Sequence, residues 1–229
     1  MRELLLIRHG QASFHADDYD QLSPLGERQS TLLGQWLAEC GAAPDLVAMG
    51  PRVRHRDTAL PCLRAAGIEA QPVTLPGLDE VAHMELLARY RPELAAPGAL
   101  RAAMKQEADP SRSFQRLFVD ALARWTSGRH DSDYTHSWPQ FRSDVLDALR
   151  QLADAPANTI WAFTSGGPIA VIVASLLQTP ELQTFELSWS LVNTGVTRLR
   201  LGSRANSVVT FNTWPHLERE RDAQLVTLR

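Results

Sequence analysis

The chain has 229 residues, 44% of them hydrophobic, and a formal net charge of −3. This composition is typical of a soluble globular protein and provides core material for one large domain or two small ones. The charge balance argues against a nucleic-acid or membrane surface. The two cysteines, Cys40 and Cys62, make no disulfide framework, so a reducing compartment is expected.

The N-terminal residues show no signal-peptide pattern, and no apolar stretch reaches the roughly 18 residues of a membrane helix. These features predict a cytoplasmic protein.

The first predicted element is a buried strand that ends at an arginine and a histidine. The unbroken apolar run at residues 4–7 fits a strand covered on both faces of a parallel sheet. Arg8 and His9 would then lie at its carboxyl end, where open α/β sheets bind ligands. A cation, an imidazole and a close-packing Gly10 suit a doubly charged anion such as a phosphate ester. Taken alone, the tripeptide also fits a polar turn at the surface.

The next 70 or so residues alternate between helix and strand patterns. Ser23 and Pro24 predict a helix start, and Gly41 predicts its end. A strand at 46–49 precedes a helix that runs from Arg52 to Gly67. A third strand is expected at 68–75, with Glu80 on or just after the following turn.

The second half begins with a helical insertion and returns to a strand and helix order. Residues 84–125, broken by prolines, predict two or three helices without a strand between them. Another helix opens at Ser137, a strand follows at 159–163, and a tight turn at 164–168 leads into an apolar helix. Segments 196–201 and 207–211 resemble a terminal hairpin. We expect an α/β fold, a three-layer α/β/α sandwich with a mostly parallel sheet. It forms a single domain over residues 1–229, with the insertion at about 84–136 acting as a lid.

Four segments that carry polar or glycine residues each follow a predicted strand. Because the carboxyl ends of parallel strands meet at one edge of a sheet, we expect these segments to gather into one site. They are Arg8-His9-Gly10-Gln11, Arg54, Glu80 and the turn at residues 164–168.

These segments resemble the histidine phosphatase superfamily, the phosphoglycerate mutase-like enzymes, over nearly the whole chain. Residues 8–11 match the opening Arg-His-Gly-(Glu/Gln), and residues 22–29 match Leu-(Ser/Thr)-x-x-Gly-x-x-Gln. Residues 50–59 match Ser-Pro-x-x-Arg-x-x-x-Thr-Ala, with Gly50 replacing the serine and Arg54 on the phosphate-binding arginine. Residues 78–80 match Leu-x-Glu.

The fourth family motif departs from its pattern in this chain. The superfamily has (Ser/Thr)-His-Gly-Gly after its late strand, and that histidine is the second catalytic imidazole. This sequence has Thr164-Ser165-Gly166-Gly167, so Ser165 stands at the histidine position.

The resemblance implies a role for each matched residue. His9 would be the nucleophile that forms a phosphohistidine. Arg8 and Arg54 would hold the phosphoryl oxygens, and Glu80 would give a proton to the leaving alcohol and later take one from water. Arg52 and Arg56, the arginines on either side of Arg54, are interpreted as solvated.

Ser165 removes one cation from the implied site. Its hydroxyl and the backbone at Gly166 can still donate hydrogen bonds to phosphate. Gln11, Ser13 and Ser23 could contact phosphate or substrate, or hydrogen-bond within surface loops. A compensating imidazole could come from His83, His136 or His216.

The sequence thus predicts a phosphomonoester hydrolase that works through a phosphohistidine on a small phosphorylated metabolite. One alternative is a weak or inactive homologue that binds a phosphorylated ligand. A remote alternative is a serine hydrolase in which Ser165 acts with Glu186 and His216, because residues 163–167 resemble a partial nucleophile elbow. A mutase fits less well, since returning the phosphoryl group requires a site that excludes water.

No cofactor or metal is expected, because the seven histidines show no His-x-x-x-His or similar ligand spacing. The expected partner is the small phosphorylated substrate, with neither nucleic acid nor membrane. The sequence carries no indication of oligomeric state.

Overall fold

The computed structural model describes residues 2–13, 20–180 and 183–228. The chain divides into two compact units, of which the first combines residues 1–80 with 144–229 and the second comprises Val81–Ser143. No helix within the described residues is long and apolar enough to cross a membrane.

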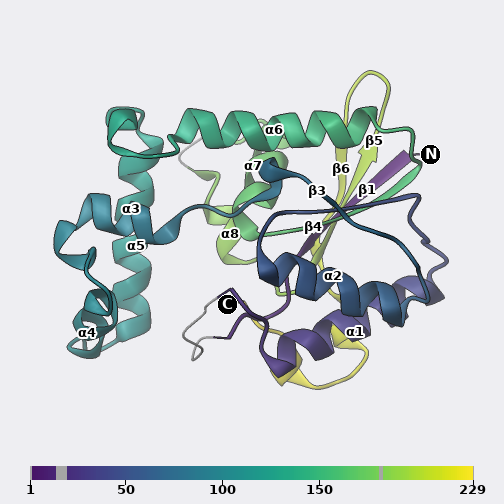
Figure 1. The fold of residues 1–229 in the computed structure, drawn as a ribbon, viewed down its shortest axis with the longest axis horizontal. Coiled ribbons are helices and arrows are strands. Elements are labelled where there is room, and N and C mark those ends of the chain that lie inside the picture. The colour runs from purple at the N-terminus through teal and green to yellow at the C-terminus, as the bar shows by residue number, and fades with distance from the viewer. Residues whose placement is uncertain (1, 14–19, 181–182, 229) are drawn as a thin grey trace. The chain divides into compact units, whose positions relative to one another are not determined.

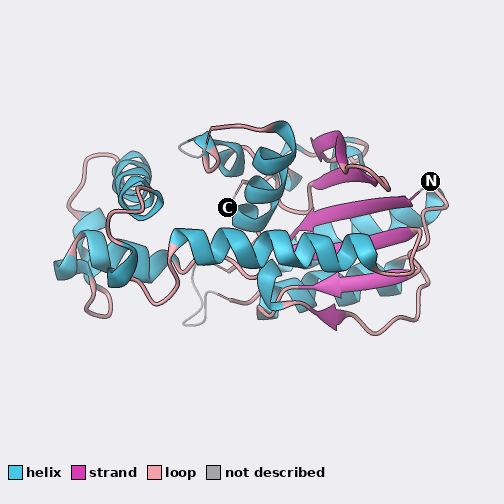
Figure 2. Cartoon of the chain, turned by 90° about the horizontal axis from the view of Figure 1, so that it is seen from above, coloured by secondary structure: helices cyan, strands magenta, loops and turns pink. Residues whose placement is uncertain are grey.

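The first unit is built on one six-stranded sheet, in the order β3-β2-β4-β1-β5-β6 (Figures 1 and 2). Four neighbouring strands are parallel: β3 (Val73–Thr74), β2 (Leu46–Met49), β4 (Thr159–Thr164) and β1 (Arg2–Arg8). The last two, β5 (Val196–Leu201) and β6 (Ser207–Thr213), run antiparallel. The predicted mostly parallel sheet is confirmed.

Strand β3 is shorter than predicted, two residues instead of the segment 68–75. It lies at the edge of the sheet and pairs only with Ala48 and Met49 of β2. Pro72, just before it, has no N–H to extend the ladder. The apolar pattern of residues 68–75 therefore overstates the strand.

Helices cover both faces of the sheet (Figure 1). On one face lie α1 (Pro24–Glu39) and α2 (Val53–Ala65), and on the other lie α7 (Gly166–Leu177) and the later part of α6 (Trp138–Asp154). The short helices α8 (Glu186–Trp189) and α9 (Pro215–Glu218) complete this unit. The core between β1, β4 and the first pair of helices is fully buried and includes Leu5, Ile7, Leu33, Leu37, Trp161 and Phe163.

Helix α1 begins where the sequence predicts. Ser23 accepts a hydrogen bond from the Gly26 N–H, and Pro24 occupies the first turn. The turn after β1 lies directly against this helix, because a Cβ added at Gly10 would be 2.6 Å from the carbonyl oxygen of Gly26. This contact fixes the chain that follows His9.

The second unit contains α3 (His83–Tyr90), α4 (Ala99–Lys105) and α5 (Pro110–Thr126), together with the first residues of α6. No strand occurs within its described residues, which agrees with the predicted helices. Its aromatic core centres on Trp125, which contacts Tyr134, Trp138 and Phe141. A lid function for this unit stays a prediction.

Candidate active site

Sheet register brings His9 and Ser165 together. In the parallel pair β1 and β4, Arg8 is the partner of Thr164, so the next residue of each strand lies at the carboxyl edge. The backbone N–H of His9 donates to the Thr164 carbonyl at 2.9 Å. On the other side of β4, the Gly50 N–H donates to the Phe163 carbonyl at 2.9 Å. Three strand ends therefore meet at one place.

The His9 imidazole is buried and held in one tautomer. Its Nδ1 lies 2.7 Å from the Gly10 carbonyl oxygen. Since a carbonyl only accepts, Nδ1 carries the proton and the lone pair is on Nε2. Burial lowers the pKa of His9 well below 6.5, and the charges of Arg54 and Arg8 lower it further. The ring is neutral near pH 7, which is the state a nucleophile requires.

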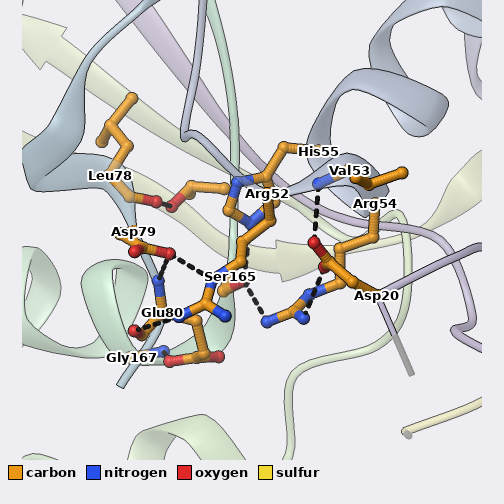
Figure 3. A network of polar contacts seen from close by, with 11 residues as sticks. Asp20, Arg52, Val53, Arg54, His55, Leu78, Asp79, Glu80, Ser165 and Gly167 are labelled. Atoms are coloured by element: carbon orange, nitrogen blue, oxygen red, sulfur yellow. Dashed lines mark hydrogen bonds and ion pairs between the residues drawn. The ribbon is translucent and has the colours of Figure 1, made fainter. Parts of the chain in front are cut away.

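Arg54 projects from the first turn of α2 into this cluster with only 4% of its surface exposed. Its Nη1 donates to Asp20 Oδ1 at 2.9 Å, and its Nη2 lies 3.4 Å from Ser165 Oγ (Figure 3). Asp20 also accepts from the backbone N–H of Val53 at 2.8 Å, at the start of α2. The carboxylate of Asp20 thus contacts the arginine that is predicted to bind phosphate. No sequence motif had indicated Asp20 as a site residue.

Arg8 lies beside His9 and donates through Nη1 to two backbone carbonyls, one just after α8 and one near the C-terminus. These belong to Leu191 and, at 3.0 Å, Leu228. Its positive charge nevertheless acts on the His9 ring, whose pKa it helps to lower. A direct contact between Arg8 and phosphate stays a prediction.

Glu80 lies at the N-terminus of α7, the helix that follows Ser165. Its Oε1 accepts from the Gly167 N–H at 3.2 Å. Arg52, interpreted from the sequence as solvated, is instead half-buried: it forms an ion pair with Asp79 and reaches the Glu80 carbonyl at 3.4 Å (Figure 3). That interpretation was wrong because the 79–80 segment returns to the start of α2, which the sequence pattern does not reveal.

An imidazole that sequence analysis missed contacts Ser165. His55 is fully buried, and its Nε2 lies 2.7 Å from Ser165 Oγ (Figure 3). The centroid of its ring is 6.0 Å from that of His9. Burial, and then the charge of Arg54, lower the pKa of His55 to about 3, so the ring is neutral near pH 7.

Gly50 makes the space that His55 occupies. A Cβ added at Gly50 would lie 2.4 Å from His55 Nδ1 and 2.3 Å from the Leu78 carbonyl oxygen. The sequence shows small residues at both positions that depart from the family motifs, Gly50 and Ser165. Read together, these two departures could have indicated room for another side chain.

The remaining predicted phosphate contacts hydrogen-bond within the protein. Gln11 Oε1 accepts from Ser23 Oγ at 2.8 Å, and Ser13 Oγ donates to the Leu22 carbonyl at 3.0 Å. Gly166 opens α7 directly after Ser165. Of these residues, Ser165 and Gly166 lie in the cluster formed by His9, Arg54 and Glu80.

The three histidines proposed to compensate for Ser165 have other neighbours. His216 is buried, its Nε2 lies 2.9 Å from Thr194 Oγ1, and its ring lies against Trp36. The predicted pairing of Ser165 with His216 was therefore wrong, because His55 occupies that position. His83 and His136 belong to the second unit, where they contact Phe118 and Phe141.

The described residues contain no group of three or more His, Cys, Asp or Glu side chains able to hold a metal ion. What gathers at this edge is a neutral imidazole, a buried guanidinium, a carboxylate and a helix N-terminus. This set suits chemistry on a phosphate group.

A model of the histidine phosphatase superfamily (branch 1) matches residues 4–213. The chain belongs to this superfamily. It is therefore a phosphatase of the histidine phosphatase type, as its motifs predict. No curated protein matches the sequence.

Solved structures of superfamily enzymes share the fold. A phosphoglycerate mutase from Bacillus anthracis has a TM-score of 0.67 at 12% identity, covering 96% of this chain and 97% of its own. A mycobacterial glucosyl-3-phosphoglycerate phosphatase in complex with inorganic phosphate has a TM-score of 0.61 at 19% identity, covering 94% and 99%. A mutant phosphoserine phosphatase from Entamoeba histolytica, in complex with phosphoserine, has a TM-score of 0.55 at 18% identity, covering 95% and 100%.

Proposed function

We propose that this histidine phosphatase hydrolyses small phosphorylated metabolites through a phosphohistidine on His9. The observation that carries the proposal is the state of the His9 ring. The hydrogen bond from Nδ1 to Gly10 leaves the lone pair on Nε2, and burial keeps the ring neutral. A neutral, oriented imidazole next to the buried guanidinium of Arg54 is suited to attack phosphorus.

In the first step, the Nε2 lone pair forms a bond to phosphorus as the ester P–O bond breaks. The leaving oxygen takes the carboxyl proton of Glu80. Arg54 binds the oxygens of the phosphoryl group during transfer, exchanging its contact with Asp20 for the more highly charged anion. The N-terminus of α7, where Gly166 begins the helix, adds backbone N–H groups at the same edge.

In the second step, water forms a bond to phosphorus as the P–N bond breaks. The Glu80 carboxylate takes a proton from that water, which restores its carboxyl group and releases inorganic phosphate. The contact between Glu80 and Gly167 supports this role, because it holds the carboxylate at the helix start that follows Ser165.

The comparisons support a small phosphorylated substrate. Among structures of the same fold, one relative contains inorganic phosphate and another contains phosphoserine. Each binds its anion with a chain about as long as this one, and the present chain provides Arg54 and the α7 N-terminus for that purpose.

Turnover of p-nitrophenyl phosphate by wild type and by His9→Ala tests the proposal. We expect His9→Ala to reduce turnover to the uncatalysed background, because no other described group at the site is assigned to form the covalent bond. His130→Ala, which changes an exposed histidine, should retain wild-type turnover.

A phosphate-binding protein without turnover is the second candidate, favoured by one observation. Ser165, where the resemblance implies a catalytic histidine, leaves the site with one fewer cation. Equal background rates in wild type and His9→Ala, together with calorimetric binding of inorganic phosphate that is lost in Arg54→Ala, would support that candidate over the hydrolase.

A further inference from the structure

The buried pair of His55 and Ser165 has no role in the steps above. Both side chains are fully buried, and they meet at 2.7 Å between Nε2 and Oγ. Arg54, which is assigned to the phosphoryl group, lies 3.4 Å from the same hydroxyl oxygen. A buried imidazole this close to the reacting centre requires an explanation.

Hydrogen-bond accounting limits what the Ser165 hydroxyl can do. A hydroxyl has one proton to donate and two lone pairs to accept with, whereas the Arg54 guanidinium only donates. If His55 Nε2 also donates, both lone pairs of Oγ are occupied and the hydroxyl proton points to a third group. If Nε2 accepts instead, the hydroxyl proton is directed to His55 and is lost to any ligand.

The other ring nitrogen of His55 leaves this choice open. Nδ1 lies near the Gly50 backbone, a contact that raises the pKa of the ring, but it forms no well-aligned hydrogen bond within the described part of the chain. The ring proton can therefore move to Nε2. A phosphoryl group bound between His9 and Arg54 attracts the Ser165 proton by its negative charge. Binding of the anion therefore favours the arrangement in which Nε2 donates to Oγ and Oγ–H donates to phosphate.

We propose that Ser165 contacts the transferred phosphoryl group through its hydroxyl, and that His55 is the positioning residue which turns that hydroxyl toward it. The inference rests on the proposed phosphatase function. Gly50 is part of the same arrangement, since its missing Cβ leaves space for the His55 ring. His55 acts through Ser165 and makes no bond to phosphorus.

A double-mutant cycle on turnover of p-nitrophenyl phosphate tests the pair. Removing one preorganised donor typically costs about 10²-fold in kcat. We expect Ser165→Ala and His55→Ala each to lose about that factor in kcat with little change in KM. The double variant should lose no more than either single variant, because the two residues act as one unit.

His55→Gln is the conservative variant, since its amide N–H can donate to Oγ without titrating. We expect it to restore kcat to within several-fold of wild type. This rescue separates positioning from packing, and it keeps the test valid if His55→Ala does not fold. Ser203→Ala and His130→Ala change exposed residues and serve as matched controls.

Three results would overturn the inference. They are wild-type kcat in Ser165→Ala, losses that multiply in the double variant, and an acid-stable phosphoserine at residue 165, which would make Ser165 the nucleophile. Failure of the phosphatase proposal is distinguishable, because His9→Ala would then leave turnover unchanged, whatever the cycle shows.

Discussion

Asp20 shows how one residue can tune an anion site without contacting phosphorus. Its two carboxylate oxygens are divided between the Arg54 guanidinium and the first backbone N–H of α2, at 2.9 and 2.8 Å. Both of those groups attract anions, so a phosphate ester must share them with a carboxylate.

Asp20→Asn should therefore strengthen substrate binding. The amide oxygen can still accept from Val53 N–H, but the negative charge beside Arg54 is gone. A charge removed several ångströms from a dianion is worth on the order of 1 kcal/mol, or about fivefold in KM for p-nitrophenyl phosphate. Steady-state kinetics measure this change, with Asp154→Asn as a control at an exposed carboxylate. A raised KM would show that Asp20 orients Arg54 instead of competing for it.

Residue identities at the site were predictable where a strand end carried the signal. His9 follows the apolar run of β1, and Arg54 and Glu80 stand at fixed offsets in motifs. His55 escaped prediction because its role depends on empty space at Gly50, and that space is indicated only when the departures at Gly50 and Ser165 are read together. Arg52 escaped because its partner, Asp79, is remote in sequence.

At the scale of elements, the site depends on how β2 ends against β4. Gly50 follows β2, donates to the Phe163 carbonyl, and lies under the His55 ring of α2. Gly50 also lies against the carbonyl oxygen of Leu78. That oxygen accepts a hydrogen bond from Thr164 Oγ1 at 2.7 Å. One glycine therefore lets two strand ends and a helix approach.

Gly50→Ala should destabilise the fold and reduce kcat together. The added methyl group would lie 2.3 Å from a backbone oxygen and 2.4 Å from His55, and backbone yields less readily than side chain. Overpacking of this kind costs about 1–3 kcal/mol. Urea denaturation followed by circular dichroism measures the free energy of unfolding.

Gly166→Ala is the matched control for stability. A Cβ added at Gly166 would lie no closer than 3.6 Å to any neighbouring atom. The urea concentration at which half of this variant is unfolded should therefore stay near that of wild type. If the urea midpoint of Gly50→Ala equals that of wild type, the close contacts around residue 50 do not require a glycine there.

Element starts were predictable where capping residues marked them, as at Ser23 and Pro24. The three helices of the second unit were likewise predictable from their proline breaks. The length of β3 was not, because strand formation at an edge depends on the partner offered by β2.

At the scale of the molecule, burial of histidines couples folding to pH. His55 and His216 are both buried, and burial is the largest cause that lowers the pKa of each from 6.5 to about 3. The pKa of His9 is lowered as well. In the unfolded chain these rings take up protons near pH 6.5, whereas in the folded protein they do not. Acid therefore favours the unfolded state.

The direction in which the free energy of unfolding changes with pH follows from which state binds more protons. Above pH 6.5 neither state binds these protons, and the full stability is present. As the pH falls from 6.5 toward 3, the unfolded state binds more protons, and each buried histidine costs about 1.4 kcal/mol per pH unit. Because domains are stable by only about 5–15 kcal/mol, we expect unfolding within a few pH units below 6.5.

His216→Gln should make the free energy of unfolding fall less steeply with decreasing pH, by the contribution of one proton. Glutamine can keep a hydrogen bond to Thr194 but does not titrate. Urea midpoints measured from pH 7 to pH 5 for wild type, His216→Gln and the exposed control His130→Gln give the slopes. Identical slopes in wild type and His216→Gln would mean that the buried ring is protonated in the folded protein.

The most direct measurement of the central assignment is the covalent state of His9 during turnover. Wild-type protein is mixed with p-nitrophenyl phosphate, quenched in alkali to preserve phosphoramidate bonds, digested, and analysed by mass spectrometry. The account predicts a phosphoryl group on His9 that disappears as substrate is exhausted and never forms in His9→Ala. Turnover with an unmodified His9, or with phosphate on another residue, would contradict it.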